Sequence, residues 1–350
     1  MRKFYVSLVL CLLWITPIVS QIKTDKDRDQ LVGQVKSVKA YLIEFVRLGN
    51  GIAEEKRRPW YYTTYNTEGN FASRTTYDRS GPIIQKLVYT YDANGRSTGY
   101  EEYAAMVDKN LGVPRHHVYR LNEEGRRVEY IVFESNGSVA QRFAYNYDAR
   151  GNLIEEQWYT HTGRLGGRLV STFDEQGNQT SQTSYLEDGA LSWKNVSKYD
   201  ANGNRTEWIQ HQGNTLKYKI LFSYDSKNRM LENETVEFNR IPGTLPATHS
   251  PEPGKVVYTY DDDKRTKEVA TYEVDGMLKQ KVVHAYDERK NEVGLTTFSA
   301  DSSRKNGETY SINIEYDSQG NWTRKTRLIQ SEKGGQPQPY HAEMRVITYY

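Results

Sequence analysis

Histidines and paired carboxylates are the side chains of this sequence that best suit metal or acid–base chemistry. A strand points neighbouring residues to opposite faces, so His116 and His117 cannot act on one ligand, and no other histidines have the spacing of zinc ligands. A glycosidase needs two carboxylates that face one substrate. The paired carboxylates here are sequence neighbours, so they too point to opposite faces of a strand. The residues in question are His116, His117, His161, His211, His249, His284 and His341, with Glu101 beside Glu102 and Glu155 beside Glu156. No Gly-x-Ser-x-Gly element, phosphate loop or dinucleotide fingerprint occurs, so we expect no catalytic residues and no enzymatic activity.

Three consecutive aspartates, Asp261, Asp262 and Asp263, are the best calcium candidates in the chain. A calcium loop supplies about six to eight oxygen ligands, including a distal Glu, and these turns lack that set. We expect the aspartates to stabilise their own turns, and we expect neither a metal site nor a cofactor.

Tryptophans are the residues best suited to binding a partner, because they combine an apolar face with a polar tip. Five of them do not recur at one position of the repeat described below, so they are not simply a structural ladder. These tryptophans are the candidates for binding a partner, although we expect first that they fill the inner face of a curled sheet. They are Trp60, Trp158, Trp193, Trp208 and Trp322.

A repeat of 26 residues positions these side chains. Ten similar six-residue segments begin at Tyr65, Tyr91, Leu121, Tyr147, Phe173, Tyr199, Tyr224, Tyr260, Tyr286 and Tyr316. Five of the nine intervals between them are 26 residues, which excludes chance similarity. A second, weaker turn lies about twelve residues after the first, so each repeat predicts one β-hairpin.

The first turn has the chemistry of a three-residue hairpin loop. Its Asp suits the first position of a type I turn, and its Gly suits the left-handed position that follows. The structural turn residues are therefore Asp92, Gly95, Asp148, Gly151, Asp174, Gly177, Asp200, Gly203, Asp317 and Gly320. Lys264 and Lys290 replace the Gly in two copies and predict strained or different turns.

Between the turns, hydrophobic and polar residues alternate as in a sheet with one polar face. We therefore expect an all-β fold, a continuous antiparallel meander of about ten hairpins that forms a curled or spiralling sheet. A β-propeller is the alternative. Residues 21–64 are expected to be N-terminal capping strands and residues 65–350 the repeat array, with an exposed Pro-rich loop at 241–254.

The recurring Tyr-Asp-x-x-Gly segments resemble the YD-repeat, or Rhs-repeat, family of secreted and cell-surface bacterial proteins. The resemblance covers roughly residues 60–350 and implies a curled antiparallel sheet in an extracellular setting. Large members carry a toxin after the repeats. Here no further domain is expected after Tyr350, so the chain looks like a small secreted member without a toxin.

The first twenty residues read as a secretory signal peptide, with Arg2 and Lys3 ahead of an apolar run and cleavage near Ser20. An uncleaved anchor is the alternative. Cleavage would remove the only Cys, Cys11, and leave 45 basic against 45 acidic residues. The neutral balance predicts no nucleic-acid partner. No other stretch is apolar enough to cross a bilayer as a helix, so we expect a secreted, periplasmic or cell-surface protein without stable membrane insertion.

These observations lead to a functional hypothesis. We expect a secreted, non-enzymatic scaffold that binds a glycan or an envelope or extracellular protein along its sheet face. A shell or accessory component of a toxin-delivery system is the first alternative, and a polysaccharide hydrolase is the second.

Overall fold

The computed structural model describes residues 24–48, 51–105, 111–238, 253–298, 309–329 and 336–350. In these residues the fold consists of one short helix, α1 (Asp25–Arg28), and 22 strands. The first eleven strands are β1 (Val35–Leu48), β2 (Gly51–Tyr65), β3 (Phe71–Tyr77), β4 (Ile83–Tyr91), β5 (Ser97–Ala104), β6 (Arg115–Leu121), β7 (Arg127–Phe133), β8 (Val139–Tyr147), β9 (Leu153–Tyr159), β10 (Leu165–Phe173) and β11 (Gln179–Leu186). The others are β12 (Leu191–Tyr199), β13 (Arg205–Gln212), β14 (Thr215–Tyr224), β15 (Met230–Glu237), β16 (Gly254–Asp261), β17 (Thr266–Tyr272), β18 (Leu278–Tyr286), β19 (Glu292–Phe298), β20 (Tyr310–Tyr316), β21 (Trp322–Ile329) and β22 (Gln338–Tyr349).

Each Tyr-Asp turn folds for reasons local to its own six residues. In the turn after β8, the amide of Asp148 donates to the carbonyl of Asn152 and the amide of Gly151 donates back to Asp148, both at 3.0 Å. The Asp148 carboxylate accepts the amides of Arg150 and Asn152, at 3.0 and 2.8 Å. Gly151 has a φ of 90°, where a side chain would be strained. In the turn after β18 the left-handed position is held by Lys290, with a φ of 63°.

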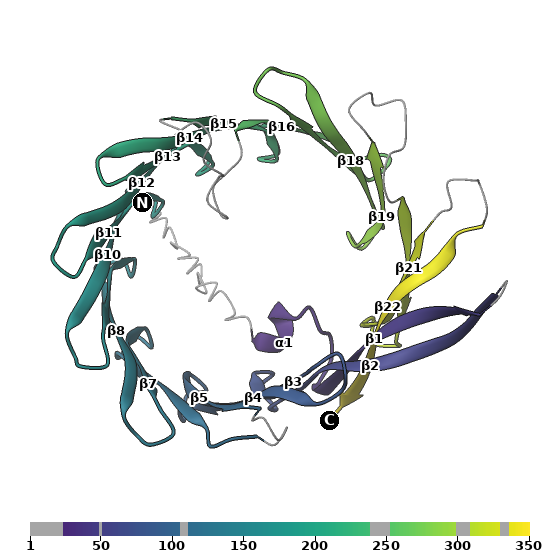
Figure 1. The fold of residues 1–350 in the computed structure, drawn as a ribbon, viewed down its shortest axis with the longest axis horizontal. Helices are drawn as coiled ribbons and strands as arrows, with labels where there is room; N and C mark the ends of the chain where they lie inside the picture. Colours follow the sequence, from purple (N-terminus) through teal and green to yellow (C-terminus); the bar gives the residue numbers. More distant parts are fainter. Residues whose placement is uncertain (1–23, 49–50, 106–110, 239–252, 299–308, 330–335) are drawn as a thin grey trace, which may run out of the picture.

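The sheet closes into a barrel. Every strand pairs antiparallel with the next, and β1 also pairs antiparallel with β22, from Val35 opposite Tyr349 to Glu44 opposite His341. Figure 1 shows the resulting ring. The expected spiralling sheet is therefore wrong, and so is the propeller alternative: the fold is a closed antiparallel barrel of 22 strands. Closure removes the two unpaired edges that an open sheet would expose to water and to other chains.

The helix α1 lies inside the ring (Figure 1), and residues 24–34 contact both the turn after β2, through Lys26 and Gly69, and the turn after β20, through Val32 and Asn321. Thr24 caps α1, and the amide of Lys26 donates to the carbonyl of Gly69 at 2.9 Å. Farther along the segment, Leu31 is buried and packs with Val35, Val38 and Tyr65. No helix in the described part of the chain has the length and apolarity to cross a membrane.

Several sequence expectations fall on residues that the structure does not describe. The signal peptide and its cleavage site precede residue 24, and most of the Pro-rich segment 241–254 is also undescribed. Within residues 21–64, expected as capping strands, the structure places β1 and β2 as the longest strands of the ring.

Candidate functional site

The register of the strands identifies the face of the sheet that lines the barrel. The helix α1 lies within the ring (Figure 1), and the hydroxyl of Tyr65 donates to Asp29, the residue after α1, at 2.6 Å, so Tyr65 and the Phe71 ring beside it must point inward. Directly paired residues share a face, so the inner face can be followed from strand to strand. We call the space that this face surrounds the lumen. An eight-stranded barrel is about the size that side chains can fill, so a lumen walled by 22 strands is too wide for its own side chains.

Aromatic rings form a row across the inner face from β2 to β8. Ring centroids are 5.6 Å apart for Tyr65 and Phe71, 5.4 Å for Phe71 and Tyr89, and 5.9 Å for Tyr89 and Tyr100. The row continues through β6 and β7 and ends with Tyr130 stacked on Phe143 at 5.6 Å. Such contacts are worth about 0.5–1.5 kcal/mol per pair beyond burial, so this part of the wall is held by its own lining.

A buried histidine interrupts the row. His117 is 6% exposed, and its ring stacks on Tyr100 with centroids 4.1 Å apart. Its Nε2 lies 3.0 Å from a Glu102 oxygen, and its Nδ1 lies 2.7 Å from the Tyr130 hydroxyl. Burial lowers the pKa of His117 below its usual value, and the Glu102 carboxylate opposes that shift. Both ring nitrogens have partners, as expected for a polar group built into a wall.

A cavity of about 970 Å³ lies between α1 and the inner face of β3 to β9. Tyr89, Tyr91, Tyr119, Tyr145 and Tyr147 line it, together with polar and charged residues of α1 and of the turns. Two of these hydroxyls are occupied: Tyr91 donates to the carbonyl of Phe71 and Tyr147 to that of Arg127, each at 2.8 Å. These two tyrosines therefore offer ring surface to the cavity.

The same hydroxyl contact explains the Tyr of the repeat. In the regular copies the Tyr that precedes one turn donates to the first strand residue after the previous turn, and so ties adjacent hairpins together. Tyr199 contacts the carbonyl of Gln179 in this way at 2.9 Å, and Tyr224 that of Arg205 at 2.9 Å. Across the closure, the hydroxyl of Tyr350 donates to the carbonyl of Tyr65, the last residue of β2.

The outer face carries cross-strand ion pairs. Glu129 is paired with Arg120 at 2.8 Å and with Arg142 at 2.5 Å. On β13, Glu207 lies between Lys198 at 2.8 Å and Lys219 at 2.9 Å, and hydrogen bonds from these two ammonium groups lower the pKa of Glu207. From β2 to β8, therefore, the inner face carries the row of aromatic rings, and the outer face carries cross-strand ion pairs such as those of Glu129.

Four of the five candidate tryptophans face the lumen. Trp158 pairs with Phe143, Trp208 with Ser197, and Trp193 with Ser184, all on the inner face. Trp322 also faces inward, where the guanidinium of Arg345 lies 3.6 Å from its ring centroid. Trp60 is at an irregularity of β2 and is 38% exposed. The structure therefore distributes the tryptophans around the ring instead of gathering them into one exposed patch.

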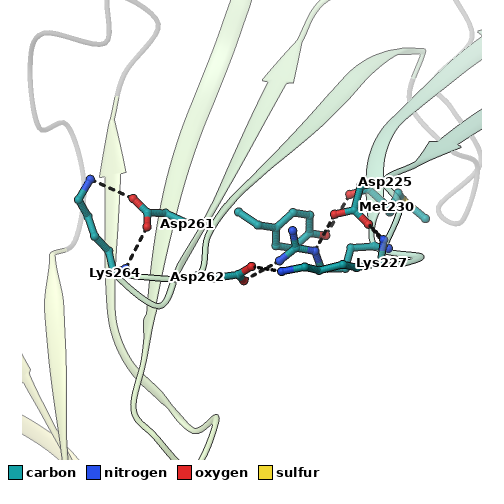
Figure 2. Close-up of polar contacts among 8 residues, drawn as sticks. Asp225, Lys227, Met230, Asp261, Asp262 and Lys264 are labelled. Carbon is teal, nitrogen blue, oxygen red and sulfur yellow. Dashed lines mark hydrogen bonds and ion pairs between the residues drawn. The ribbon is translucent and has the colours of Figure 1, made fainter.

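Two of the three candidate calcium aspartates, Asp261 and Asp262, are engaged with cations (Figure 2). Asp262 contacts Lys227 at 2.6 Å and Arg229 at 2.7 Å, which links two successive turns. Asp261 accepts the amide of Lys264 at 2.9 Å and pairs with its ammonium group at 2.9 Å. Among the residues that the structure describes, no cluster of three His, Cys, Asp or Glu could hold a metal ion.

The other chemical candidates are separated by the sheet. Glu101 is on the outer face near His116, whereas Glu102 is on the inner face with His117. Glu155 pairs with Arg168 outside, and Glu156 faces Leu169 inside. His249 lies outside the described residues.

Sequence reasoning missed the residues that build the cavity. Tyr119 and Tyr145 follow the ordinary alternation of their strands, and nothing in their spacing sets them apart. Arg127 faces inward although Glu129, two residues later, faces outward, because the pairing of β6 with β7 is irregular at this point. The inward positions of successive repeats are rich in tyrosine, and that enrichment was the available signal.

Comparisons with known proteins are limited. A family model described as "Uncharacterised protein" matches residues 23–196. No curated protein matches the sequence. Among solved structures, a porin-like protein from Bacteroides uniformis has 10% identity and a TM-score of 0.30, over 91% of this chain and 99% of that one. A Photorhabdus luminescens Tc holotoxin pore has 14% identity and a TM-score of 0.29, over 86% of this chain and 17% of that one. TM-scores this low carry no inference about function.

These findings correct the expected identity and function. Membership of the YD-repeat family is wrong, because the matching family model is a different, uncharacterised one. The scaffold that binds a glycan or protein along an open sheet face is wrong as well, because the sheet closes and turns most of its tryptophans inward. The toxin-delivery shell was expected because of the resemblance to that family, so this alternative is wrong as well. A polysaccharide hydrolase is not supported, because neither adjacent carboxylate pair shares a face.

The expectations about partners and location change too. A mature chain without stable membrane insertion was inferred from the absence of a long apolar run, and that reasoning is wrong for a closed barrel, which can cross a bilayer with alternating strands. The list of expected partners is therefore wrong as well. Export from the cytoplasm, the coarser part of the expected localisation, stands.

Proposed function

We propose that this protein is a non-enzymatic barrel of the outer cell envelope that holds or passes an elongated amphipathic molecule in its lumen. The observation that carries this proposal is the row of aromatic rings on the inner face from β2 to β8, beside a space that is wider than the side chains can fill. The expected signal peptide supports export of the chain.

The energetics of the lining favour an occupant. Apolar surface facing water is unfavourable in proportion to its area, about 25 cal/mol per Å². Large exposed apolar surfaces in natural proteins usually mark binding sites. Tyrosines such as Tyr91 and Tyr147, whose hydroxyls are occupied by backbone carbonyls, present ring surface that an apolar chain or flat ring would cover.

A channel across the outer membrane is the second candidate, and the closed wall favours it because a closed barrel leaves no unpaired edge in lipid. Two features oppose it. Outer-face Arg or Lys costs about 2–4 kcal/mol at the midplane of a bilayer, and Arg120 and Lys198 belong to outer-face ion pairs. Spanning strands have about 9–11 residues, whereas β3, β6 and β7 have seven each. We therefore place the conduit for an amphipathic molecule first.

Binding of a neutral apolar dye tests the proposal. N-phenyl-1-naphthylamine should bind the purified protein saturably with a rise in fluorescence. Tyr145 lines the cavity, and its neighbour Asn146 lies on the outer face. Tyr145→Ala should therefore weaken binding, whereas Asn146→Ala, the matched control, should leave it unchanged. Absence of saturable binding by the unaltered protein would refute the proposal, and stepwise conductance in planar lipid bilayers without dye binding would favour the channel.

A further inference from the structure

The cavity beside α1 contains a cation without a carboxylate partner. Arg127, the first residue of β7, is partly buried, and its guanidinium lies 3.6 Å from the ring centroid of Tyr119 and 5.7 Å from that of Tyr130. In the described part of the chain it forms no ion pair, whereas Arg28 and Arg96, which also line the cavity, are paired with Asp25 and Asp92.

No acidic residue in the described lining of the cavity forms an ion pair with Arg127, although the Glu156 carboxylate lies opposite Tyr145 on the inner face. Of the two acidic residues of α1, Asp25 lines the cavity, and its two oxygens accept from Arg28 at 3.2 Å and from the amide of Phe71 at 2.9 Å. Glu68 and Glu124 belong to exposed turns at the rim. Removing a guanidinium from water without a counter-charge is unfavourable, and aromatic faces compensate only in part, by about 0.5–2 kcal/mol.

The surroundings of Arg127 define the rest of the ligand. Burial raises the pKa of Tyr119 and Tyr145, and the nearby guanidinium opposes that rise in both. Beyond them the rings of Tyr89, Tyr91 and Tyr147 continue the wall. A guanidinium at one end of a row of rings complements a molecule with an anionic head and an apolar body.

We propose that this cavity binds an amphipathic carboxylate, with the carboxylate on Arg127 and the apolar body along the tyrosine rings. The inference rests on the proposed function of the lumen and names the class of molecule and its anchor. Arginine suits this role because its planar fork of N–H donors matches a carboxylate.

Calorimetric titration with dodecanoate and with dodecanol, its neutral counterpart, tests the assignment. The unaltered protein should bind dodecanoate more tightly than dodecanol. Arg127→Met, which keeps an unbranched side chain against Tyr119, should weaken dodecanoate binding on the order of tenfold to a hundredfold and leave dodecanol binding unchanged. Arg127→Lys should retain part of the preference.

Arg168→Met is the matched control, because Arg168 also lies over a tyrosine ring, that of Tyr185, but on the outer face. It should bind both compounds as the unaltered protein does. If Arg127→Met fails to fold, the preference of the unaltered protein for dodecanoate over dodecanol still tests the carboxylate site. Equal binding of the two compounds, with the neutral dye still bound, would overturn the carboxylate site and leave the proposed function standing. Failure of all three to bind would overturn both.

Discussion

Replacement of Asn321 by alanine should weaken the closure of the barrel more than any equivalent replacement in the repeat. Asn321 follows the turn after β20 and is 2% exposed. Its side chain accepts from the amide of Val32 at 2.7 Å and donates to the carbonyl of Val32 and to the hydroxyl of Tyr349, each at 2.8 Å. It therefore joins the N-terminal segment to the last strand.

The size of the effect follows from the groups that lose a partner. Asn321→Ala leaves the amide and the carbonyl of Val32 without that side chain, while Tyr349 keeps its contact with Asp317. The replacement removes three hydrogen bonds of a buried side chain, each worth about 0.5–1.5 kcal/mol, so the loss in unfolding free energy should be about 2–4 kcal/mol. That is a large share of the roughly 5–15 kcal/mol by which typical proteins are stable.

Asn152 is the matched control, because it occupies the same position in another repeat. Its side chain contacts only the carboxylate of its own turn, Asp148, at 2.8 Å, so Asn152→Ala should cost about 1 kcal/mol. Urea unfolding measures both losses, and hydrogen exchange should rise in β1 and β22 for Asn321→Ala alone. Equal losses for the two variants, or unchanged exchange in β1 and β22, would refute the reasoning.

Four further changes test other parts of the structure. Lys290→Gly relieves a left-handed φ of 63° and should raise the unfolding free energy by about 1 kcal/mol. Gly320→Ala should lower it by a similar amount through backbone strain alone, because a Cβ at this position meets no atom within 4 Å. Calorimetry that finds no change in either variant would contradict the turn assignment. Tyr199→Phe removes the hydroxyl contact with Gln179 and should cost about 1 kcal/mol in urea unfolding, and an unaltered midpoint would mean that the contact does not stabilise the sheet. Because burial lowers the pKa of His117, the unfolded chain takes up this proton first, and the unfolding free energy should fall as the pH drops below 6.5; His117→Gln should remove that dependence, and an identical pH profile would exclude it.

Local structure was readable from the sequence because its causes are local. The Asp and Gly of a turn such as Asp148 to Gly151 interact within six residues, so composition and spacing predict the hairpin. The alternation of the strands likewise identifies two faces. Which of the two faces curves inward depends on long-range closure of the sheet, and the alternation alone does not reveal it.

Closure could not be predicted because it depends on contacts between residues at opposite ends of the chain. Val35 pairs with Tyr349, and Asn321 contacts Val32 across 289 residues. In its own sequence, Asn321 looks like every other Asn of the repeat. The cavity was missed for the same reason: Arg127 resembles other basic residues that follow a turn, and only the curved sheet surrounds it with tyrosines.

A disulfide across the closure is the most direct test of the account. Ser37 on β1 and Thr348 on β22 are paired in register, and their hydroxyl oxygens are 2.6 Å apart. With Cys11 replaced by Ser, the variant Ser37→Cys/Thr348→Cys should oxidise to a monomer with an internal disulfide, whereas Ser37→Cys/Thr172→Cys should not, because Thr172 lies on β10, elsewhere in the ring (Figure 1). A folded monomer that retains both thiols in the first variant, or one that forms only linked dimers, would contradict a barrel closed within one chain.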